Sequence, residues 1–150
     1  MFAACMGIIN NTFLGIIVKK EIDKLAWLYI QDGKLLVARS KNKALFYIPG
    51  GKREAGESDE QALIREVKEE ISVDLMPDSI KSAGVFKAQA DGQRHGVVVK
   101  LTCYYADFEG QLAPDAEIEE IALIGHDDKH RCSSGAIQVL DWLKKESVIK

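Results

Sequence analysis

Residues 51–73 read GKREAGESDEQALIREVKEEISV, and this stretch decides how the rest of the chain is interpreted. A glycine-containing turn leads into a helix in which Glu66, Glu69 and Glu70 stand at positions i, i+3 and i+4. This spacing places the three side chains beside one another on one helix face. At about 6 Å and an effective dielectric constant near 20, each pair repels by about 3 kcal/mol before salt screening. A chain keeps such a cluster most readily where a cation binds, so the stretch predicts a metal site.

The donor atoms indicate which metal is expected. The cluster offers carboxylate oxygens with no Cys or His among them, which favours Mg²⁺ or Mn²⁺ over Zn²⁺. Mg²⁺ keeps several waters and takes only a few protein carboxylates, so three glutamates exceed the needs of one ion. The excess fits either two or more ions in the substrate complex or one glutamate that acts as general base. Such an ion neutralises phosphate oxygens and lowers the pKa of bound water, so we expect phosphate chemistry.

The stretch resembles the Nudix box, whose pattern is G-x5-E-x7-R-E-U-x-E-E-x-G-U, where U is a bulky aliphatic residue. One fixed position departs from the pattern, because Ser72 stands in place of the second glycine. A left-handed residue is often needed where a helix ends, and serine there costs about 1 kcal/mol. The positions in register are Gly51, Glu57, Arg65, Glu66, Val67, Glu69, Glu70 and Val73.

The resemblance implies roles for the site residues. Glu66, Glu69 and Glu70 would bind Mg²⁺, with Mn²⁺ as a substitute, and the Gly50 carbonyl would add a ligand. Arg65 would orient the catalytic glutamates through charge-assisted bonds that involve Glu57; the alternative is an ordinary solvated helix cation. Candidates for substrate contacts are Gly51, Lys52 and Arg39, with a plain surface role as the alternative for Arg39.

The resemblance also implies an α/β fold of the Nudix type, an α/β/α sandwich with a mixed β-sheet between helices. The domain is expected at residues 22–150, after an apolar extension at 1–21 whose status is open: an added strand or helix, or a misassigned start. Periodicity and turn residues predict the following elements: a hairpin of 25–30 and 35–38 about Asp32-Gly33, a strand at 44–48, a helix after Ser58 or Asp59, a hairpin of 80–90 and 97–108 about Asp91-Gly92, a strand at 117–124, and a C-terminal helix capped by Ser133 or Ser134.

Bulk properties limit the classes of partner. A length of 150 residues suits one domain, and the net charge of −3 gives no footprint for duplex nucleic acid. The apolar start, Met1 to Val18, has no basic residue before Lys19 and is interrupted by polar residues, which argues against a signal peptide or a membrane span. The three cysteines, Cys5, Cys103 and Cys132, lack metal spacing and indicate reduced thiols. These properties favour a cytoplasmic protein, and the resemblance to the Nudix family implies a monomer or homodimer that acts on a small nucleotide.

Several other side chains have a functional and a structural interpretation. Glu119 or Glu120, in an acidic patch with Asp115 and Glu117, would supply a further metal ligand or base, although a solvated strand edge is favoured. Trp27, Phe46 and Tyr47 would stack on a base, but a core position is favoured for each. The histidines are expected on the surface: His95, His126 and His130.

The substrate is indicated only by what the chain lacks. In the family, ADP-ribose hydrolases often carry a proline about 15 residues after the box, and dinucleoside polyphosphate hydrolases a tyrosine a little further on. The stretch Lys87–Asp91 has neither, which favours hydrolysis of nucleoside triphosphates, damaged ones included, to a nucleoside monophosphate and pyrophosphate. The alternatives are a non-catalytic nucleotide sensor and a hydrolase of nucleotide sugars or RNA 5′ ends.

Overall fold

The computed structural model describes residues 12–13, 16–17 and 20–150. Its helical elements are α2 (Asp59–Ile71), α3 (Ser134–Lys145) and the 3-10 turns η1 (Pro77–Ser79) and η2 (His126–Arg131). One sheet has the order β6-β3-β9-β8, from β6 (Gly50–Gly51), β3 (Lys20–Leu28), β9 (Val97–Tyr105) and β8 (Lys81–Gln89). A second has the order β11-β5-β4, from β11 (Ile118–Ile124), β5 (Lys34–Ser40) and β4 (Ile30–Gln31). Two short pairs are β1 (Thr12–Phe13) with β2 (Ile16–Ile17), and β7 (Asp74–Leu75) with β10 (Phe108–Glu109).

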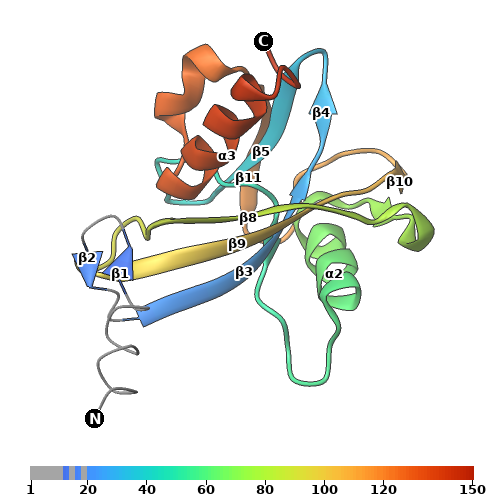
Figure 1. The fold of residues 1–150 in the computed structure, drawn as a ribbon. Coiled ribbons are helices and arrows are strands. Elements are labelled where there is room, and N and C mark those ends of the chain that lie inside the picture. Colours follow the sequence, from blue (N-terminus) through green and yellow to red (C-terminus); the bar gives the residue numbers. More distant parts are fainter. Residues whose placement is uncertain (1–11, 14–15, 18–19) are drawn as a thin grey trace.

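The sheets lie between α2 and α3, which cover opposite faces (Figure 1). Alternate residues of β3 supply the two faces: Leu25 and Trp27 pack with α2, whereas Ala26 and Leu28 pack with α3. Burial of both faces explains why β3 ends in a continuous apolar run. β3 is parallel to β9, whereas the β8–β9, β3–β6 and β5–β11 pairs are antiparallel, so the sheet is mixed. The predicted α/β/α sandwich is confirmed.

The first predicted hairpin is right at its turn and wrong in the pairing of its first strand. Asp32 and Gly33 both have positive φ, at 55° and 74°, as an Asp-Gly turn requires. β4 and β5 pair across this turn, but the strand residues before Tyr29 belong to β3 and pair with β6 and β9. The chain therefore changes sheets near Tyr29, which a short-range hairpin pattern cannot reveal.

The predicted strand at 44–48 is wrong. This segment makes only isolated bridges, from Tyr47 to Ala38 and from Phe46 to Cys132. The reason is that the chain turns away at once through Pro49 into the glycine pair, which forms β6 against β3. The second predicted hairpin, β8 with β9, is confirmed, as are the strand at β11 and the helix α3.

Other predictions concern the ends of the chain and the cysteines. Most of the predicted extension at 1–21 lies outside the described residues, and β3 begins at Lys20. No helix in the described ranges is long and apolar enough to cross a membrane. Cys103 and Cys132 are free, as expected. Both are also buried, and burial raises the pKa of their thiols to about 12 and about 11. Cys5 lies among the residues that are not described.

Both ends of α2 are fixed by serines. Ser58 is the N-cap, as predicted, and forms a capping box with Gln61: the Gln61 amide donates to Ser58 Oγ at 3.1 Å and the Ser58 amide to Gln61 Oε1 at 3.0 Å. Ser72 is the C-cap with φ 70° and ψ 11°, the left-handed conformation expected of the missing glycine. Its hydroxyl donates to the Ala113 carbonyl at 3.0 Å, a contact that glycine would lack.

This dual role of Ser72 gives a prediction. Ser72→Ala keeps the left-handed backbone cost and loses the hydrogen bond, so it should lower the free energy of unfolding by about 1 kcal/mol. Ser72→Gly loses the same bond but relieves the backbone, so its stability should stay near that of the wild type. Urea denaturation should therefore rank the glycine variant about 1 kcal/mol above the alanine variant. Equal stability of the two variants would contradict the backbone argument.

Candidate active site

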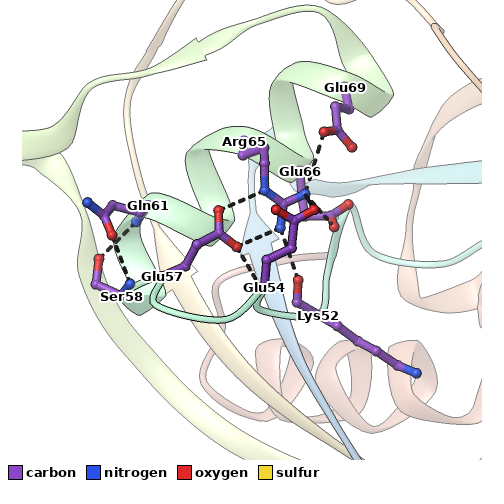
Figure 2. A network of polar contacts seen from close by, with 8 residues as sticks. All are labelled: Lys52, Glu54, Glu57, Ser58, Gln61, Arg65, Glu66 and Glu69. Carbon is purple, nitrogen blue, oxygen red and sulfur yellow. Dashed lines mark hydrogen bonds and ion pairs between the residues drawn. The ribbon is translucent and has the colours of Figure 1, made fainter.

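Arg65 is the centre of a polar network at the start of the site (Figure 2). Its Nε and Nη2 donate to the two oxygens of Glu57 at 2.7 and 2.8 Å, a bidentate pair. Its Nη1 donates to Glu66 Oε1 at 2.9 Å and lies 3.5 Å from Glu69 Oε1. Nη2 also donates to the Lys52 carbonyl at 3.2 Å, which ties the helix to the glycine turn. The predicted contact of Arg65 with Glu57 and the clustered glutamates is confirmed.

The Glu57 carboxylate stays ionised near neutral pH. The hydrogen bond from Arg65, followed by one from the Glu54 amide, lowers the pKa of Glu57 to about 2. The same pairing with Glu57 raises the pKa of Arg65 above its ordinary value. Glu57 therefore holds Arg65 in place as a fixed anion and has no proton to exchange near neutral pH.

Glu70 has a contrasting environment. Its Oε1 accepts a hydrogen bond from the Gly50 amide at 2.8 Å. Burial, opposed by that bond and reinforced by the charges of Glu66 and Glu69, raises the pKa of Glu70 to about 7. We expected the Gly50 carbonyl as a metal ligand and did not foresee that the amide of the same residue would fix Glu70. A left-handed φ of 147° at Gly50, in a position where a Cβ would lie 2.0 Å from the Leu25 carbonyl oxygen, makes glycine necessary there.

The three glutamates share the helix face but do not form a ready metal site. Across residues 20–150 and the described parts of the first strands, no group of three or more His, Cys, Asp or Glu side chains is arranged to hold a metal ion. Arg65 Nη1 contacts both Glu66 and Glu69, and the Gly50 amide donates to Glu70, so each carboxylate already has a partner within the protein. The donor set nevertheless fits Mg²⁺, because it consists of oxygens and because a cation would relieve the accumulated charge on a buried Glu70.

Gly51 is required by the closeness of this cluster. A Cβ on Gly51 would lie 2.5 Å from Cδ of Glu66, so any side chain there would displace the carboxylate. Gly51 also lines the cavity described next. Gly51 thus adjoins both the cluster and the cavity, and its role in substrate binding stays a prediction.

A cavity of about 340 Å³ extends from the box to the N-terminal end of α3. The size is at the lower end for small-molecule sites. Its lining joins box residues to charged, polar and aromatic groups from four other segments: Gly50, Gly51, Glu70, Lys24, Lys43, Tyr47, Asp91 and Ser133. A larger, more open cleft of about 1000 Å³ lies around η1 and Tyr105–Asp107, but none of its lining residues belongs to the box. The smaller cavity is therefore the candidate site.

Two predicted phosphate contacts are not brought into this cavity. Arg39 is bound instead by Glu119 and Glu120, each at 3.2 Å, and only its neighbours Ala38 and Ser40 line the cavity. The side-chain alternation of β5 explains this, since residue 39 faces away from residues 38 and 40. The same ion pairs leave Glu119 and Glu120 at a solvated strand edge, the interpretation we favoured. Lys52 offers Arg65 its carbonyl, and its ammonium points away from Arg65 in Figure 2.

The three aromatic residues considered for base stacking lie in different environments. Trp27 and Phe46 are core residues, 0% and 4% exposed, as favoured. The core interpretation is wrong for Tyr47, which is 38% exposed and lines the cavity. His95 and His130 are exposed, as expected, and His126 pairs with Asp141 at 2.8 Å.

Sequence reasoning missed one network that holds the turn before α2. Arg53 pairs with Asp59 and, at 3.1 Å, with Asp23, while the Tyr104 hydroxyl donates to Asp59 at 2.6 Å. These contacts join the turn to β3 and β9. Burial, with Asp59 as an acceptor, raises the pKa of Tyr104 to about 12, so the phenol stays a donor. No spacing rule connects residues 53, 59 and 104, because the sheet alone brings them together.

Comparisons with known proteins identify chains that are similar to this one. A family model described as the NUDIX domain matches residues 23–143. The CTP pyrophosphohydrolase of Escherichia coli (strain K12) is 32% identical over 98 residues, which cover 62% of this chain and 68% of that protein. The ADP-ribose pyrophosphatase of Methanocaldococcus jannaschii is 32% identical over 93 residues, which cover 60% of this chain and 53% of that protein.

Solved structures agree as well. The solution structure of the E. coli ORF135 protein matches with a TM-score of 0.66 and 23% identity, over 86% of this chain and 93% of that one. At this identity the match speaks for the fold alone.

Proposed function

Because this chain belongs to the Nudix hydrolase family, we propose that it is a Mg²⁺-dependent pyrophosphohydrolase of nucleoside triphosphates, giving a nucleoside monophosphate and pyrophosphate. The observation that supports this most is the cavity that joins Glu70 and the glycine turn to Tyr47 and Asp91. The cavity thus offers the Glu70 carboxylate, which would bind a cation for the phosphate chain, and the Tyr47 ring, which would stack on a base. The similarity to a CTP pyrophosphohydrolase supports a triphosphate substrate. Damaged nucleoside triphosphates are included in the proposal.

The residues have separate tasks in this proposal. Glu66, Glu69 and Glu70 would hold Mg²⁺, which when bound neutralises phosphate oxygens and lowers the pKa of water. Glu70, whose pKa is raised to about 7 by burial, is the member of the cluster best suited to exchange a proton near neutral pH. Arg65, anchored by Glu57, keeps Glu66 and Glu69 in place.

A nucleotide panel tests the proposal. Purified protein with Mg²⁺ should release a monophosphate and pyrophosphate from at least one ribo- or deoxyribonucleoside triphosphate, as resolved by ion-exchange chromatography. Omission of Mg²⁺ with EDTA present should abolish release. Binding of nucleotides without any product would instead favour the non-catalytic sensor.

ADP-ribose is the second candidate substrate, because a second relative at 32% identity is an ADP-ribose pyrophosphatase. The chain spans about half the length of that relative, which weakens the argument that the two proteins share a substrate. The same panel separates the two, since ADP-ribose would give AMP and ribose 5-phosphate rather than pyrophosphate. Nucleotide sugars and RNA 5′ ends belong in the panel for the same reason.

The positioning role of Arg65 gives a further prediction. Arg65→Lys keeps the charge but cannot donate to both oxygens of Glu57 while it reaches Glu66. We expect kcat to fall by about 10- to 100-fold with a much smaller change in KM. Arg94→Lys, an exposed arginine in the turn after β8, is the matched control and should keep full activity. A rise in KM with unchanged kcat would mean that Arg65 binds substrate instead of positioning the glutamates.

A further inference from the structure

A second carboxylate lines the same cavity as Glu70 and has no part in the metal cluster. Asp91 lies in the turn between β8 and β9 and is half-buried. Its Oδ2 accepts from the Ser134 amide at 2.9 Å and its Oδ1 accepts from the Ser134 hydroxyl at 3.1 Å. The two contacts fix the carboxylate plane against the first residue of α3, where the helix dipole favours a negative charge. Each oxygen retains a further lone pair, so Asp91 offers the cavity acceptors in a fixed orientation and no donor.

An aromatic side chain accompanies this acceptor. Tyr47 lines the cavity and is 38% exposed, so part of its surface is free to contact a ligand. Burial, followed by the charge of Asp91, raises the pKa of Tyr47, which indicates that the phenol lies within electrostatic range of that carboxylate. Aromatic rings stack on any base and do not distinguish one from another, whereas a fixed acceptor does. Selectivity would therefore come from Asp91.

We propose that Asp91 accepts a hydrogen bond from the exocyclic amino group of the substrate base, so that the site selects amino bases over the matching keto bases. This inference rests on the proposed function, which it refines. Cytosine N4 and adenine N6 are donors, whereas uracil O4 and hypoxanthine O6 are acceptors. A keto oxygen would face the carboxylate with no proton between them, and both would lose water without a partner. Sites that hydrogen-bond a substrate group reject analogues without it strongly, so we expect a preference of at least about 100-fold in kcat/KM.

Two matched nucleotide pairs test the inference: CTP against UTP and ATP against ITP. The members of each pair differ in the exocyclic group and in the proton on the adjacent ring nitrogen, which the keto base carries and the amino base lacks. The wild-type protein should prefer the amino member of the pair that it hydrolyses. In Asp91→Asn the amide oxygen can still accept from the Ser134 amide, while the NH₂ group presents a donor to the cavity. The amino-to-keto ratio of kcat/KM should fall at least tenfold, and turnover of the keto nucleotide should rise. Asp107→Asn, an exposed aspartate outside this cavity, removes the same charge and should leave the ratio unchanged.

The ratio separates selectivity from stability, because the folded fraction affects both nucleotides equally. A variant that loses both activities in proportion, or a wild-type protein that does not discriminate within either pair, would overturn the inference while the proposed function stands. Calorimetric binding of CMP, UMP, AMP and IMP covers the case of no hydrolysis. An amino preference there that Asp91→Asn removes would support the inference although the proposed function fails, and no binding of any of the four would refute both.

Discussion

Glu69→Gln and Glu70→Gln should each lower kcat by about 10²- to 10⁴-fold while the fold survives. Glutamine keeps the size and one acceptor oxygen of each side chain, so the Gly50 amide can still donate to residue 70. What is lost is the charge that holds a divalent cation and, at one of the positions, the capacity to take a proton from water. Steady-state kinetics on the best nucleotide of the panel measures the loss.

The control for this pair lies on the same helix. Glu60 is exposed in the first turn of α2, and Glu60→Gln should keep activity within about twofold, since surface charges away from the site contribute little. Circular dichroism of all three variants checks that the helix is intact. Normal turnover in both Glu69→Gln and Glu70→Gln would show that the glutamate cluster is not required for catalysis.

The box and its helix were predictable because their signals are local. Ser58 precedes the helix at capping-box spacing, and Ser72 occupies the position of the second glycine of the pattern, so both caps follow from short stretches of sequence. The Arg65–Glu57 pair was predictable only through the resemblance, since the two residues are eight positions apart across a turn and the start of a helix.

The unpredicted parts of the site depend on contacts between distant residues. Asp91 signalled a turn, and its use as a partner of Ser134 arises because α3 packs beside the end of β8. Arg39 looked like a phosphate ligand because its charge was visible, whereas its partners on β11 lie about eighty positions away in the chain. Tyr47 was taken for a core residue because apolar neighbours surround it in sequence. In each case the partners come from distant parts of the chain, and for Arg39 the register of β5 against β11 decides which side chains it meets.

The second large effect concerns stability in the metal-free protein. Burial and the neighbouring charges of Glu66 and Glu69 raise the pKa of Glu70 from 4.5 to about 7, against the opposing effects of the Gly50 amide and Lys24. The native state therefore binds a proton at Glu70 more tightly than the unfolded chain does. Its contribution to stability is complete below pH 4.5 and is lost as pH rises to about 7, where it levels off. The loss across this window is about 3 kcal/mol.

Urea denaturation in EDTA at pH 5, 6, 7 and 8 measures this loss, with Glu70→Gln as the reference. The two proteins should have similar stability near pH 5, and the glutamine variant should be more stable by about 3 kcal/mol at pH 8. Glu57, Asp59 and Asp141 have lowered pKa values, so their contributions change only below this window and in both proteins alike. If the unfolding free energies of the wild type and Glu70→Gln changed in parallel with pH, the ionised Glu70 carboxylate would not destabilise the native state.

Addition of Mg²⁺ extends the same experiment to the site. An ion that binds only the native state should restore the stability that the wild-type protein lacks at pH 8. It should have much less effect on Glu70→Gln, in which the charge is already gone. Glu70 would then destabilise the metal-free protein and yet be required for turnover. That combination would indicate that the site is kept for catalysis at a cost in stability.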